Sequence, residues 1–402
     1  MKAVTYYSYD DIRIENRYIP TIADYELLVK VHGCGLCGSD ILKIVQQAPP
    51  PVILGHEPTG TIVEMGRGVT NFTVGQRVMV AHHVPCGHCH YCRHGNYSMC
   101  ASFKTSNIDP CGFAEYIRVP AQHVQQTTLP LPATLNDEAG SFVEPLACCI
   151  RAVRRTPLLS GDTIVILGLG SIGLLMLQAF KALAPTQNVR AIPRGRPGRE
   201  GLSASLDTIP PSRPGREGLP ASLDTIPSSR PDGENIHPHL ERHSIRVYGI
   251  DLFPERLQLA RELGVDDAFL APADEQGLRQ LIAPLTEGRG ADAIIITAAG
   301  ARPFLQAIAS VRKGGTIHSF AAHAAAVPMN LAVLYQQELS IITTYSSSPE
   351  ELRIALDLLT SRKVRVESLI SHRLPLEQFA EGVALMQKQA ALKVYFQIAG
   401  EA

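Results

Sequence analysis

The stretch Asp162-Thr-Ile-Val-Ile-Leu-Gly-Leu-Gly-Ser-Ile-Gly-Leu-Leu-Met-Leu-Gln-Ala-Phe-Lys-Ala-Leu183 decides the fold class of the chain. An apolar run enters the spacing Gly-x-Gly-x-x-Gly and continues into a helical pattern, which is the context of a dinucleotide-binding turn. Gly168 permits the tight turn, Gly170 lets a pyrophosphate approach the backbone, and Gly173 lets the helix pack closely on the strand. The start of the helix offers free N–H groups to the phosphates. The predicted cofactor-binding residues of the turn are Gly168, Gly170, Ser171, Ile172 and Gly173.

Strands and helices alternate beyond this stretch. The segment Ile245–Asp251 is a predicted strand, and Glu255–Leu263 is a predicted helix. Further strands are predicted at residues 291–297, 315–320 and 339–345. Because such alternation is typical of a parallel, doubly wound sheet, the sequence predicts an α/β fold.

An acidic residue is expected about 20 residues after the glycine turn, at the end of the second strand. Asp251 ends a strand but lies 78 residues after Gly173 (251 − 173 = 78). Between them, Arg196–Pro210 returns almost unchanged as Arg213–Pro227. Removing residues 191–246 deletes 56 residues and leaves the expected gap of 22 (78 − 56 = 22). We therefore interpret 191–246 as an inserted, duplicated element, and its Pro, Gly, Ser and Arg content is typical of a disordered linker.

The first third of the chain alternates apolar and polar residues in short runs. Glu26–His32, Gly60–Glu64 and Gly75–Val80 are typical of hairpin strands. The sequence therefore predicts an antiparallel, partly barrel-like β domain in this region. The last stretch, Pro349–Gly400, mixes amphipathic helices with a predicted strand at Leu392–Gln397, and we expect it to return to the β domain.

Four cysteines lie close together in the first third, with the spacing Cys-x2-Cys-x2-Cys-x7-Cys. Four thiolates at this spacing suit a closed tetrahedral zinc, which has no open position and stabilises the loop. An iron–sulfur cluster is the alternative, because triple-cysteine runs also hold such clusters. We favour zinc because the fourth cysteine lies nearby and no proline follows it. The four cysteines are Cys86, Cys89, Cys92 and Cys100.

A second group of candidate ligands combines a thiolate, an imidazole and a carboxylate. Cys37, His56 and Glu57 are the mix that zinc prefers, and glycines flank them. Glu144 is a further acidic candidate, and Pro145 is expected to steer it away from the helical conformation. Three protein ligands with one open position are the arrangement of a catalytic zinc. The alternative is that Cys37 is a buried apolar thiol and His56 an ordinary loop histidine.

Length and composition limit the classes of protein. A chain of 402 residues is too long for one core and predicts two domains. A net charge of −1 and a pI near 6.9 argue against nucleic acid or a membrane surface as the partner. We find no secretory signal and no apolar run of roughly 18 residues, so we expect a cytoplasmic protein. The nine cysteines, an odd count without an export signal, favour metal binding or free thiols over disulfides.

Together these motifs resemble the zinc-dependent medium-chain dehydrogenases, nearest the sorbitol and threonine dehydrogenase branch. The resemblance covers the chain except about residues 191–246. It implies a GroES-like, β-rich catalytic domain over 1–150 that contains the cysteine lobe, a Rossmann NAD-binding domain over 151–346, and a return to the catalytic domain over 347–402. Its markers are Cys37–Asp40, Gly55–Glu57, the four-cysteine lobe, Glu144–Ala147 and Gly168–Gly173.

The resemblance also implies a ligand set for the catalytic zinc. By similarity, Cys37, His56 and Glu57 bind the ion. Glu144 is then either a ligand or the group that holds the zinc-bound water, and the sequence leaves these two roles open. Zinc should acidify a bound alcohol as it acidifies water, so that hydride can pass to the nicotinamide.

The proton relay departs from the family pattern. Ser39 is expected to shuttle the proton of the alcohol, as the resemblance implies. The family's usual histidine two positions after Asp40 is Leu42 here. That difference leaves Lys43 or water to complete the outer relay.

The cofactors and partners follow from the same resemblance. Asp251 should bind the ribose diol and repel a 2′-phosphate, which favours NAD over NADP. The alternative for Asp251 is an ordinary acid at a strand end, and Arg256 would soften the preference. We expect two zinc ions per chain, a small alcohol or polyol as substrate, and a homo-oligomer.

Two further hypotheses stay open at this point. The nearer one is a threonine, butanediol or simple alcohol dehydrogenase, because pocket-lining loops decide the substrate. The other belongs to a different class of protein. It is a noncatalytic zinc- and nucleotide-binding protein, inactivated by the insert or by loss of the relay histidine.

Overall fold

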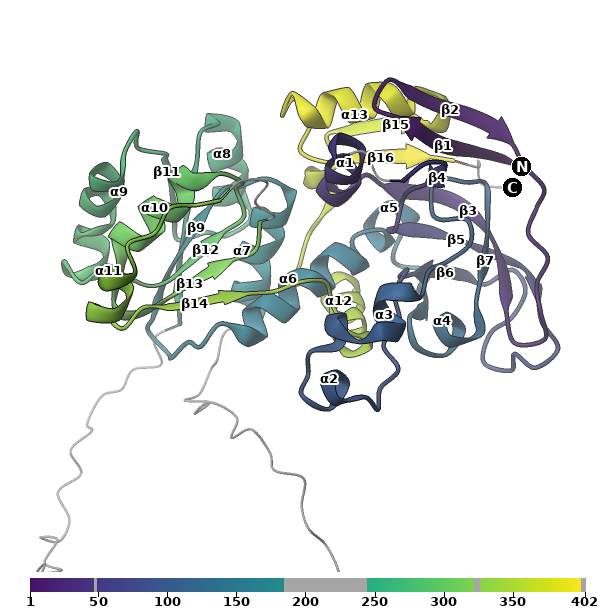
Figure 1. Cartoon of the computed structure of the whole chain (residues 1–402), viewed down its shortest axis with the longest axis horizontal. Helices are drawn as coiled ribbons and strands as arrows, with labels where there is room; N and C mark the ends of the chain where they lie inside the picture. Colours follow the sequence, from purple (N-terminus) through teal and green to yellow (C-terminus); the bar gives the residue numbers. More distant parts are fainter. Residues whose placement is uncertain (47–48, 184–243, 322–325, 399–402) are drawn as a thin grey trace, which may run out of the picture.

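The computed structural model describes residues 1–46, 49–183, 244–321 and 326–398, which form two lobes, each built on its own large sheet (Figure 1). Most of the predicted insert lies outside the described residues. Its last residue, however, begins strand β10: the N–H of Arg246 donates to the carbonyl of Asp162 at 2.9 Å, and Ile245 before it is buried. The predicted insert therefore overlaps β10 by one residue, Arg246. The same 56-residue cut fits when it is moved two positions toward the amino terminus (191 − 2 = 189 and 246 − 2 = 244).

One lobe contains a six-stranded parallel sheet in the order β11-β10-β9-β12-β13-β14. The order reverses between β9 and β12, so the predicted doubly wound α/β fold is confirmed, and this reversal is where such sheets bind dinucleotides. Strand β13 begins four residues earlier than the sequence predicted (315 − 311 = 4). The strands are β9 (Thr163–Leu167), β10 (Arg246–Asp251), β11 (Asp267–Leu270), β12 (Ala291–Ile296), β13 (Val311–Ser319) and β14 (Ser340–Thr343).

Helices cover both faces of this sheet (Figure 1). Apolar side chains of α7 and α8 share one core with the long helix α6, whereas α9 and α10 share another core with the opposite face. Two buried layers explain why the strands read as continuous apolar runs. The helices are α6 (Val143–Arg155), α7 (Ser171–Leu183), α8 (Pro254–Glu262), α9 (Glu275–Ile282), α10 (Ala301–Ser310) and α11 (Leu331–Gln336).

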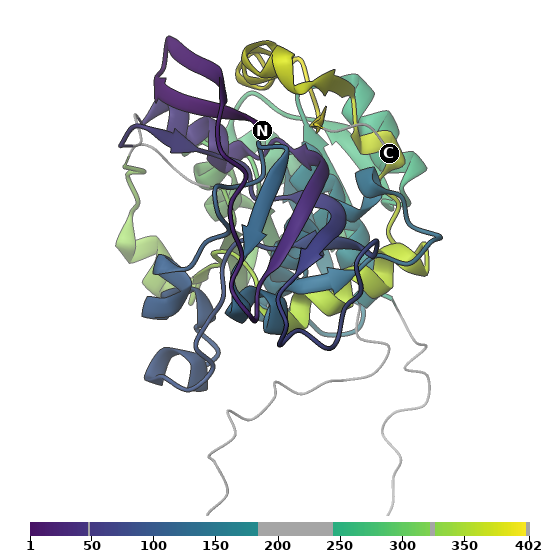
Figure 2. The same ribbon diagram turned by 90° about the vertical axis from the view of Figure 1, so that its right-hand side faces the viewer.

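The other lobe is mainly antiparallel, as predicted. Its seven-stranded sheet has the order β15-β16-β3-β5-β6-β8, with β7 paired to β3, and a three-stranded sheet has the order β2-β1-β4. Figure 2 looks onto this lobe. The strands are β1 (Lys2–Ser8), β2 (Asp11–Asn16), β3 (Leu27–Gly35), β4 (Val52–Ile53), β5 (Pro58–Met65), β6 (Arg77–Val80), β7 (Tyr116–Val119), β8 (Thr128–Pro130), β15 (His372–Pro375) and β16 (Val394–Gln397).

The end of the described chain returns to the β-rich lobe, because β16 pairs with β3. Short helices complete the lobe: α1 (Gly38–Val45), α2 (His90–Arg93), α3 (Ala101–Thr105), α4 (Ala121–Gln126), α5 (Asp137–Gly140) and α13 (Phe379–Gln387). Among the helices that the structure describes, none combines the length and the apolar character that a membrane span needs.

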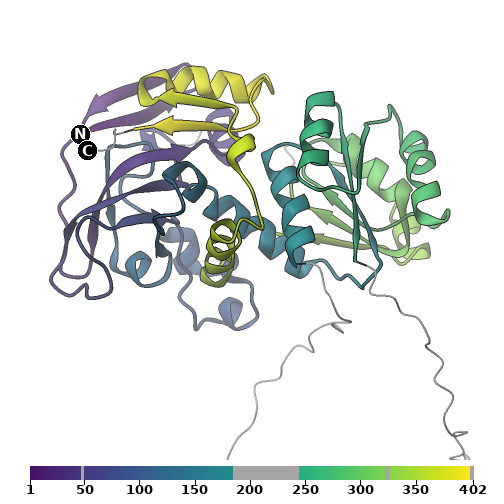
Figure 3. The same ribbon diagram turned by 180° about the vertical axis from the view of Figure 1, so that it is seen from behind.

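Helix α6 joins the two lobes. It packs on α7 and on α12 (Pro349–Thr360), which lies between the lobes in Figure 3. The expectation that Pro145 keeps Glu144 out of a helix was wrong, since both residues lie in the first turn of α6. A proline is tolerated there because the first N–H groups of a helix have no intrahelical partner. We retain the two-domain division as a proposal, with α6 running unbroken through its first boundary at 150.

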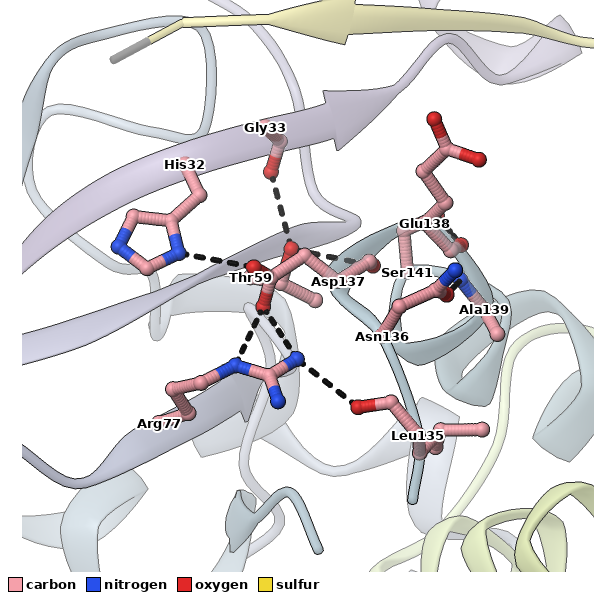
Figure 4. A network of polar contacts seen from close by, with 10 residues as sticks. All are labelled: His32, Gly33, Thr59, Arg77, Leu135, Asn136, Asp137, Glu138, Ala139 and Ser141. Atoms are coloured by element: carbon pink, nitrogen blue, oxygen red, sulfur yellow. Dashed lines mark hydrogen bonds and ion pairs between the residues drawn. The ribbon is translucent and has the colours of Figure 1, made fainter. Parts of the chain in front are cut away.

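A polar network around Asp137 ties the start of α5 to the β-rich lobe (Figure 4). One carboxylate oxygen accepts hydrogen bonds from Arg77 at 3.2 and 3.0 Å, and the other lies 2.9 Å from Nδ1 of His32. The hydroxyl of Thr59 donates to the backbone carbonyl of Asp137 at 3.2 Å. Burial opposes ionisation of Asp137, but His32 and Arg77 outweigh it and lower the pKa of the carboxyl. The network therefore fixes α5, and the chain that leads into α6, against three strands.

We predict that Asp137→Asn lowers the free energy of unfolding by about 2 kcal/mol, because it weakens charge-assisted hydrogen bonds in a largely buried network. Urea unfolding at neutral pH measures the change. Asp11→Asn is the control: Asp11 pairs with Arg13 at an exposed site, where an ion pair contributes at most about 1 kcal/mol. Equal losses in the two variants would contradict the structural role given to Asp137.

His318 is a buried histidine in the lobe that contains the parallel sheet. The two ring nitrogens of His318 lie 2.8 Å from the hydroxyl of Thr156 and 2.9 Å from that of Thr344. The side chain is fully buried, and burial together with the charge of Arg155 lowers its pKa from 6.5 to about 4. The histidine is therefore neutral in the folded protein at physiological pH.

This lowered pKa makes stability dependent on pH. Between about pH 6.5 and pH 4 the unfolded chain binds a proton at His318 that the folded chain does not, so stability falls as the pH decreases through this range. The loss from pH 7 to pH 5 should be about 2 kcal/mol for this residue. In denaturant titrations at the two pH values, His318→Gln should reduce the difference by that amount, and the more exposed His372→Gln should not. An unchanged difference in His318→Gln would refute the assignment.

Candidate active site and metal centres

The three candidate ligands of the β-rich lobe, Cys37, His56 and Glu57, lie close together. Cys37 lies directly before α1, and His56 and Glu57 lie between β4 and β5. One ligand atom from each residue lies within 4.8 Å of the other two. Gly55 adopts a φ of +96°, a conformation that favours glycine and turns the chain so that the next two side chains reach Cys37. The structure therefore brings together the residues that the sequence proposed.

Asp40 contacts two of these ligands, Cys37 and His56, and orients them. Its fully buried carboxylate accepts a hydrogen bond from the N–H of Cys37 at 3.2 Å and lies 3.2 Å from Nδ1 of His56. The other ring nitrogen, Nε2, lies 3.4 Å from the hydroxyl of Ser39. Burial opposes protonation of His56, but Asp40 and Cys37 outweigh it and raise the pKa of the imidazole well above 6.5. A carboxylate on one ring nitrogen fixes the ring so that the other nitrogen can bind a metal.

Glu57 has a cationic partner from the far end of the chain. One of its carboxylate oxygens forms an ion pair with Lys393, and both side chains are almost completely buried. The other oxygen is buried without a hydrogen-bond partner among the described residues. A buried carboxylate oxygen without a partner is costly, and a cation held with Cys37 and His56 would satisfy it. The donor set therefore fits a zinc ion.

Glu144 lies apart from the three-residue group. It is 6% exposed in the first turn of α6, and the thiol of Cys148 donates to its carboxylate at 3.5 Å. Burial raises the pKa of Glu144, an effect that Glu57 strengthens and His56 opposes. Its charge thus interacts with the group, although its carboxylate is not one of the atoms within 4.8 Å.

The glycine turn has the geometry that the sequence predicted. Gly168 has a φ of +101°, and a Cβ on Gly173 would lie 1.9 Å from the carbonyl oxygen of Gly168. No heavy atom lies within 4 Å of a Cβ built on Gly170, so the backbone there is open to a ligand. Ser171 and Ile172 are the first two residues of α7.

Asp251 faces this turn from the end of β10. Its carboxylate accepts hydrogen bonds from the N–H of Leu169 at 2.5 Å and of Phe253 at 3.0 Å. The guanidinium of Arg256 lies 3.7 Å from the same carboxylate and stacks over the ring of Phe253 at 4.3 Å. These contacts hold the Asp251 carboxylate and the Arg256 guanidinium at the position where a doubly wound sheet binds the adenosine ribose.

Helix α6 connects the metal group with the glycine turn. Its amino-terminal turn carries Glu144, and one turn later the thiol of Cys149 donates to the carbonyl of Ile172, at the start of α7, at 3.8 Å. Helix α6 thus carries Glu144, whose charge interacts with the metal group, and contacts the start of the helix that follows the cofactor turn.

The four-cysteine lobe is shaped for a tetrahedral ion. The distance between the sulfur atoms of Cys89 and Cys92 is 3.6 Å, and that between the sulfur atoms of Cys86 and Cys92 is 4.0 Å. Zinc–sulfur bonds of about 2.3 Å in a tetrahedron require sulfurs about 3.8 Å apart. The N–H groups of Cys86 and Cys89 donate to the sulfurs of Cys100 and Cys86 at 3.4 Å, as expected for thiolates. His88, His90 and His94 are exposed, as predicted for solvated loop residues.

A buried arginine docks this lobe on α6. Arg151 is 3% exposed and donates to the carbonyl of Gly95 at 2.8 Å, and its guanidinium lies 5.6 Å from the ring of Tyr97. Burial lowers the pKa of Arg151. The cysteine lobe is therefore held against the helix that also carries Glu144.

Several functional residues were missed by the sequence analysis. The role of Asp40 has a local signal, since it lies three residues after Cys37 and caps the helix that begins there. Lys393 has none, because 336 residues separate it from Glu57. Arg151 has the helical spacing from Glu144 (151 − 144 = 7) that puts both on one side of α6, but the sequence does not show that the cysteine lobe lies beside it.

Fold and site together define a zinc-binding, nicotinamide-dependent dehydrogenase. Two family models match the chain: the alcohol dehydrogenase GroES-like domain over residues 23–132 and the zinc-binding dehydrogenase family over residues 241–361. The chain belongs to this superfamily of zinc-dependent medium-chain alcohol dehydrogenases, as the motifs indicated.

Relatives match over nearly the whole chain. A sorbitol dehydrogenase of Halalkalibacterium halodurans is 28% identical over 95% of this chain and 94% of its own length. An L-threonine 3-dehydrogenase of Bacillus velezensis is 26% identical over 94% of this chain and 92% of its own. The crystal structure of galactitol-1-phosphate dehydrogenase from Escherichia coli superposes with a TM-score of 0.73 at 25% identity, covering 99% of this chain and all of that one.

Proposed function

We propose that the chain is a zinc-dependent oxidoreductase that transfers hydride between a nicotinamide cofactor and a secondary alcohol or polyol. The observation that carries this proposal is the meeting of Cys37, His56 and Glu57 within 4.8 Å, in the lobe that shares α6 with the glycine turn. Zinc in this group would lower the pKa of an alcohol hydroxyl, as it does that of water.

Protein side chains supply the remaining chemistry. Ser39, whose hydroxyl lies 3.4 Å from Nε2 of His56, is placed to relay the proton that the alcohol loses, because its oxygen can accept that proton while its own proton passes to the outer relay. Glu144 combines burial with a raised pKa, so its carboxyl is suited to hold a proton or a water beside the group. The unpartnered oxygen of Glu57 favours Glu57 over Glu144 as the third ligand. Leu42 offers no polar group to an outer relay, which leaves the exposed Lys43 or water.

We propose NAD as the cofactor rather than NADP. The carboxylate of Asp251 lies at the strand end beside the glycine turn, where it would accept hydrogen bonds from ribose hydroxyls and repel a 2′-phosphate. Arg256, 3.7 Å from that carboxylate, softens the discrimination without reversing it. We also propose two zinc ions per chain, one at Cys37, His56 and Glu57 and one at the four cysteines.

The substrate class rests on the relatives. The named relatives are a sorbitol dehydrogenase, an L-threonine 3-dehydrogenase and a galactitol-1-phosphate dehydrogenase. A threonine, butanediol or simple alcohol dehydrogenase is therefore the nearer alternative. A noncatalytic zinc- and nucleotide-binding protein is the other, and the complete donor set with its buried acids favours the enzyme.

We further propose a homo-oligomer. Strand β14 lies at the edge of its sheet, and the neighbouring helix α11 buries none of its residues. Leu331 and Tyr335 on that helix are 70% and 85% exposed. An open edge beside exposed apolar side chains favours pairing with a second copy. Sedimentation velocity should show a dimer or tetramer at micromolar concentration, and a monomer at all concentrations would contradict this.

The function is tested by following NADH formation with sorbitol, xylitol, butane-2,3-diol and threonine, together with the zinc content per chain. We predict turnover of at least one of these alcohols and two zinc ions per wild-type chain. His56→Ala should lose one zinc and about 10³-fold in kcat/KM while still binding NADH, because the metal site supplies several kcal/mol of transition-state stabilisation. His372→Ala is the control and should match the wild type.

The result that would contradict the proposal is specific. A wild-type protein that holds two zinc ions and binds NADH, but oxidises none of these alcohols and reduces none of the matching ketones, would favour the noncatalytic alternative. Equal zinc content in His56→Ala and the wild type would show that the metal group has been misassigned.

A further inference from the structure

His82 is a histidine that the proposed chemistry does not use, although it lies beside the metal group. Its ring centroid is 4.7 Å from that of His56. The ring of the adjacent His83 lies 3.7 Å from that of His82, measured between ring centroids. The ring of His82 therefore contacts both a candidate zinc ligand and a second imidazole.

The backbone around His82 is firmly anchored. Its carbonyl lies 3.0 Å from the Nε2 atom of His123. The preceding residue, Ala81, exchanges hydrogen bonds with Thr127: its N–H donates at 3.0 Å, and its carbonyl accepts from the threonine hydroxyl at 3.1 Å. The backbone of His82 is thus anchored two residues after the end of β6.

One polar atom of the His82 ring lacks a partner, unlike that of the adjacent His83. His83 is held by its Nδ1 atom, which lies 2.7 Å from the carbonyl of Ser106. By contrast, Nδ1 of His82 is buried and has no hydrogen-bond partner among the described residues. A buried polar atom without a partner carries a desolvation cost and calls for an explanation.

We propose that His82 is a specificity-determining residue that hydrogen-bonds a second hydroxyl of the substrate, on the carbon next to the one that is oxidised. This inference rests on the proposed function and narrows its substrate class to polyols and vicinal diols. A neutral imidazole has one donor and one acceptor, and a hydroxyl can serve either. The contact with His56 places the ring next to the group that would hold the reacting hydroxyl, so the neighbouring hydroxyl lies within its reach.

The energetic consequence is selectivity. A site built to hydrogen-bond a substrate hydroxyl discriminates strongly against an analogue that lacks it, because its own buried polar group is then left unpaired. A simple alcohol binding beside His82 would leave Nδ1 without a partner. A diol or polyol would satisfy it.

The test compares two substrates that differ by one hydroxyl, butane-2,3-diol and butan-2-ol. We expect the wild type to prefer the diol by at least about tenfold in kcat/KM, the effect of about one buried hydrogen bond. His82→Phe keeps a ring and removes both polar atoms, so the preference should fall to about threefold or less. His82→Asn keeps a polar atom near the position of Nδ1 and should retain most of the preference. His372→Phe is the matched control.

Binding provides a readout that does not depend on turnover. Calorimetric titration of the NADH complex with a sugar alcohol should show weaker binding by a similar factor in His82→Phe, and the zinc content should stay at the wild-type value. A preference unchanged in His82→Phe, or lost equally in His82→Asn, overturns the inference while leaving the proposed function intact. Failure of the wild type to oxidise any alcohol overturns both.

Discussion

An imbalance of buried charge is the constraint on which the candidate active site depends. Three carboxylates there are each at most 6% exposed: Asp40, Glu57 and Glu144. Two buried side chains can carry a compensating positive charge. His56 pairs with Asp40 and Lys393 with Glu57, whereas Glu144 has no cationic partner within the described chain. With the thiol of Cys37 beside them, these groups are costly to bury unless a further cation joins them. A zinc ion bound here would satisfy the oxygen of Glu57 that has no partner and would favour the ionised form of the others.

The fold brings this site to the cofactor through one helix. Helix α6 carries Glu144 at its start, contacts α7 through Cys149, and holds the cysteine lobe through Arg151. Strand β16 belongs to the β-rich lobe, and Lys393, directly before it, pairs with Glu57. The Asp137 network anchors the segment that leads into α6 (Figure 4). Glu144 and the start of α7 are thus held at a fixed separation by one rigid helix.

Much of the fold could be predicted from local sequence, because its signals are short-range. The glycine turn at Gly168 and the alternation of strands and helices specified the doubly wound sheet, and cysteine spacing specified the lobe. The wrong prediction at Glu144 has a local cause as well. Pro145 disfavours helix for the preceding residue in general, but in the first turn its missing N–H costs nothing, and burial of the apolar face of α6 decides the conformation.

The parts of the site that the sequence did not reveal depend on long-range packing. Lys393 reaches Glu57 across 336 residues, and no spacing rule connects them. His82 follows an ordinary strand, and only the fold shows that its ring lies against His56. Arg151 looks like a surface residue of a helix until the cysteine lobe covers it. Side chains of this kind are determined by which elements pack together, information that one sequence carries only diffusely.

We propose that the β-rich lobe holds two metal sites of different kinds, one at Cys37, His56 and Glu57 and one at the four cysteines. Anomalous diffraction at the zinc absorption edge, from crystals of the protein with NAD, tests it most directly. The account predicts two peaks per chain: one bonded to the sulfur of Cys37, a ring nitrogen of His56 and a glutamate oxygen, and one among the four cysteines. A map with no peak beside Cys37 and His56 in zinc-replete, active protein would contradict it.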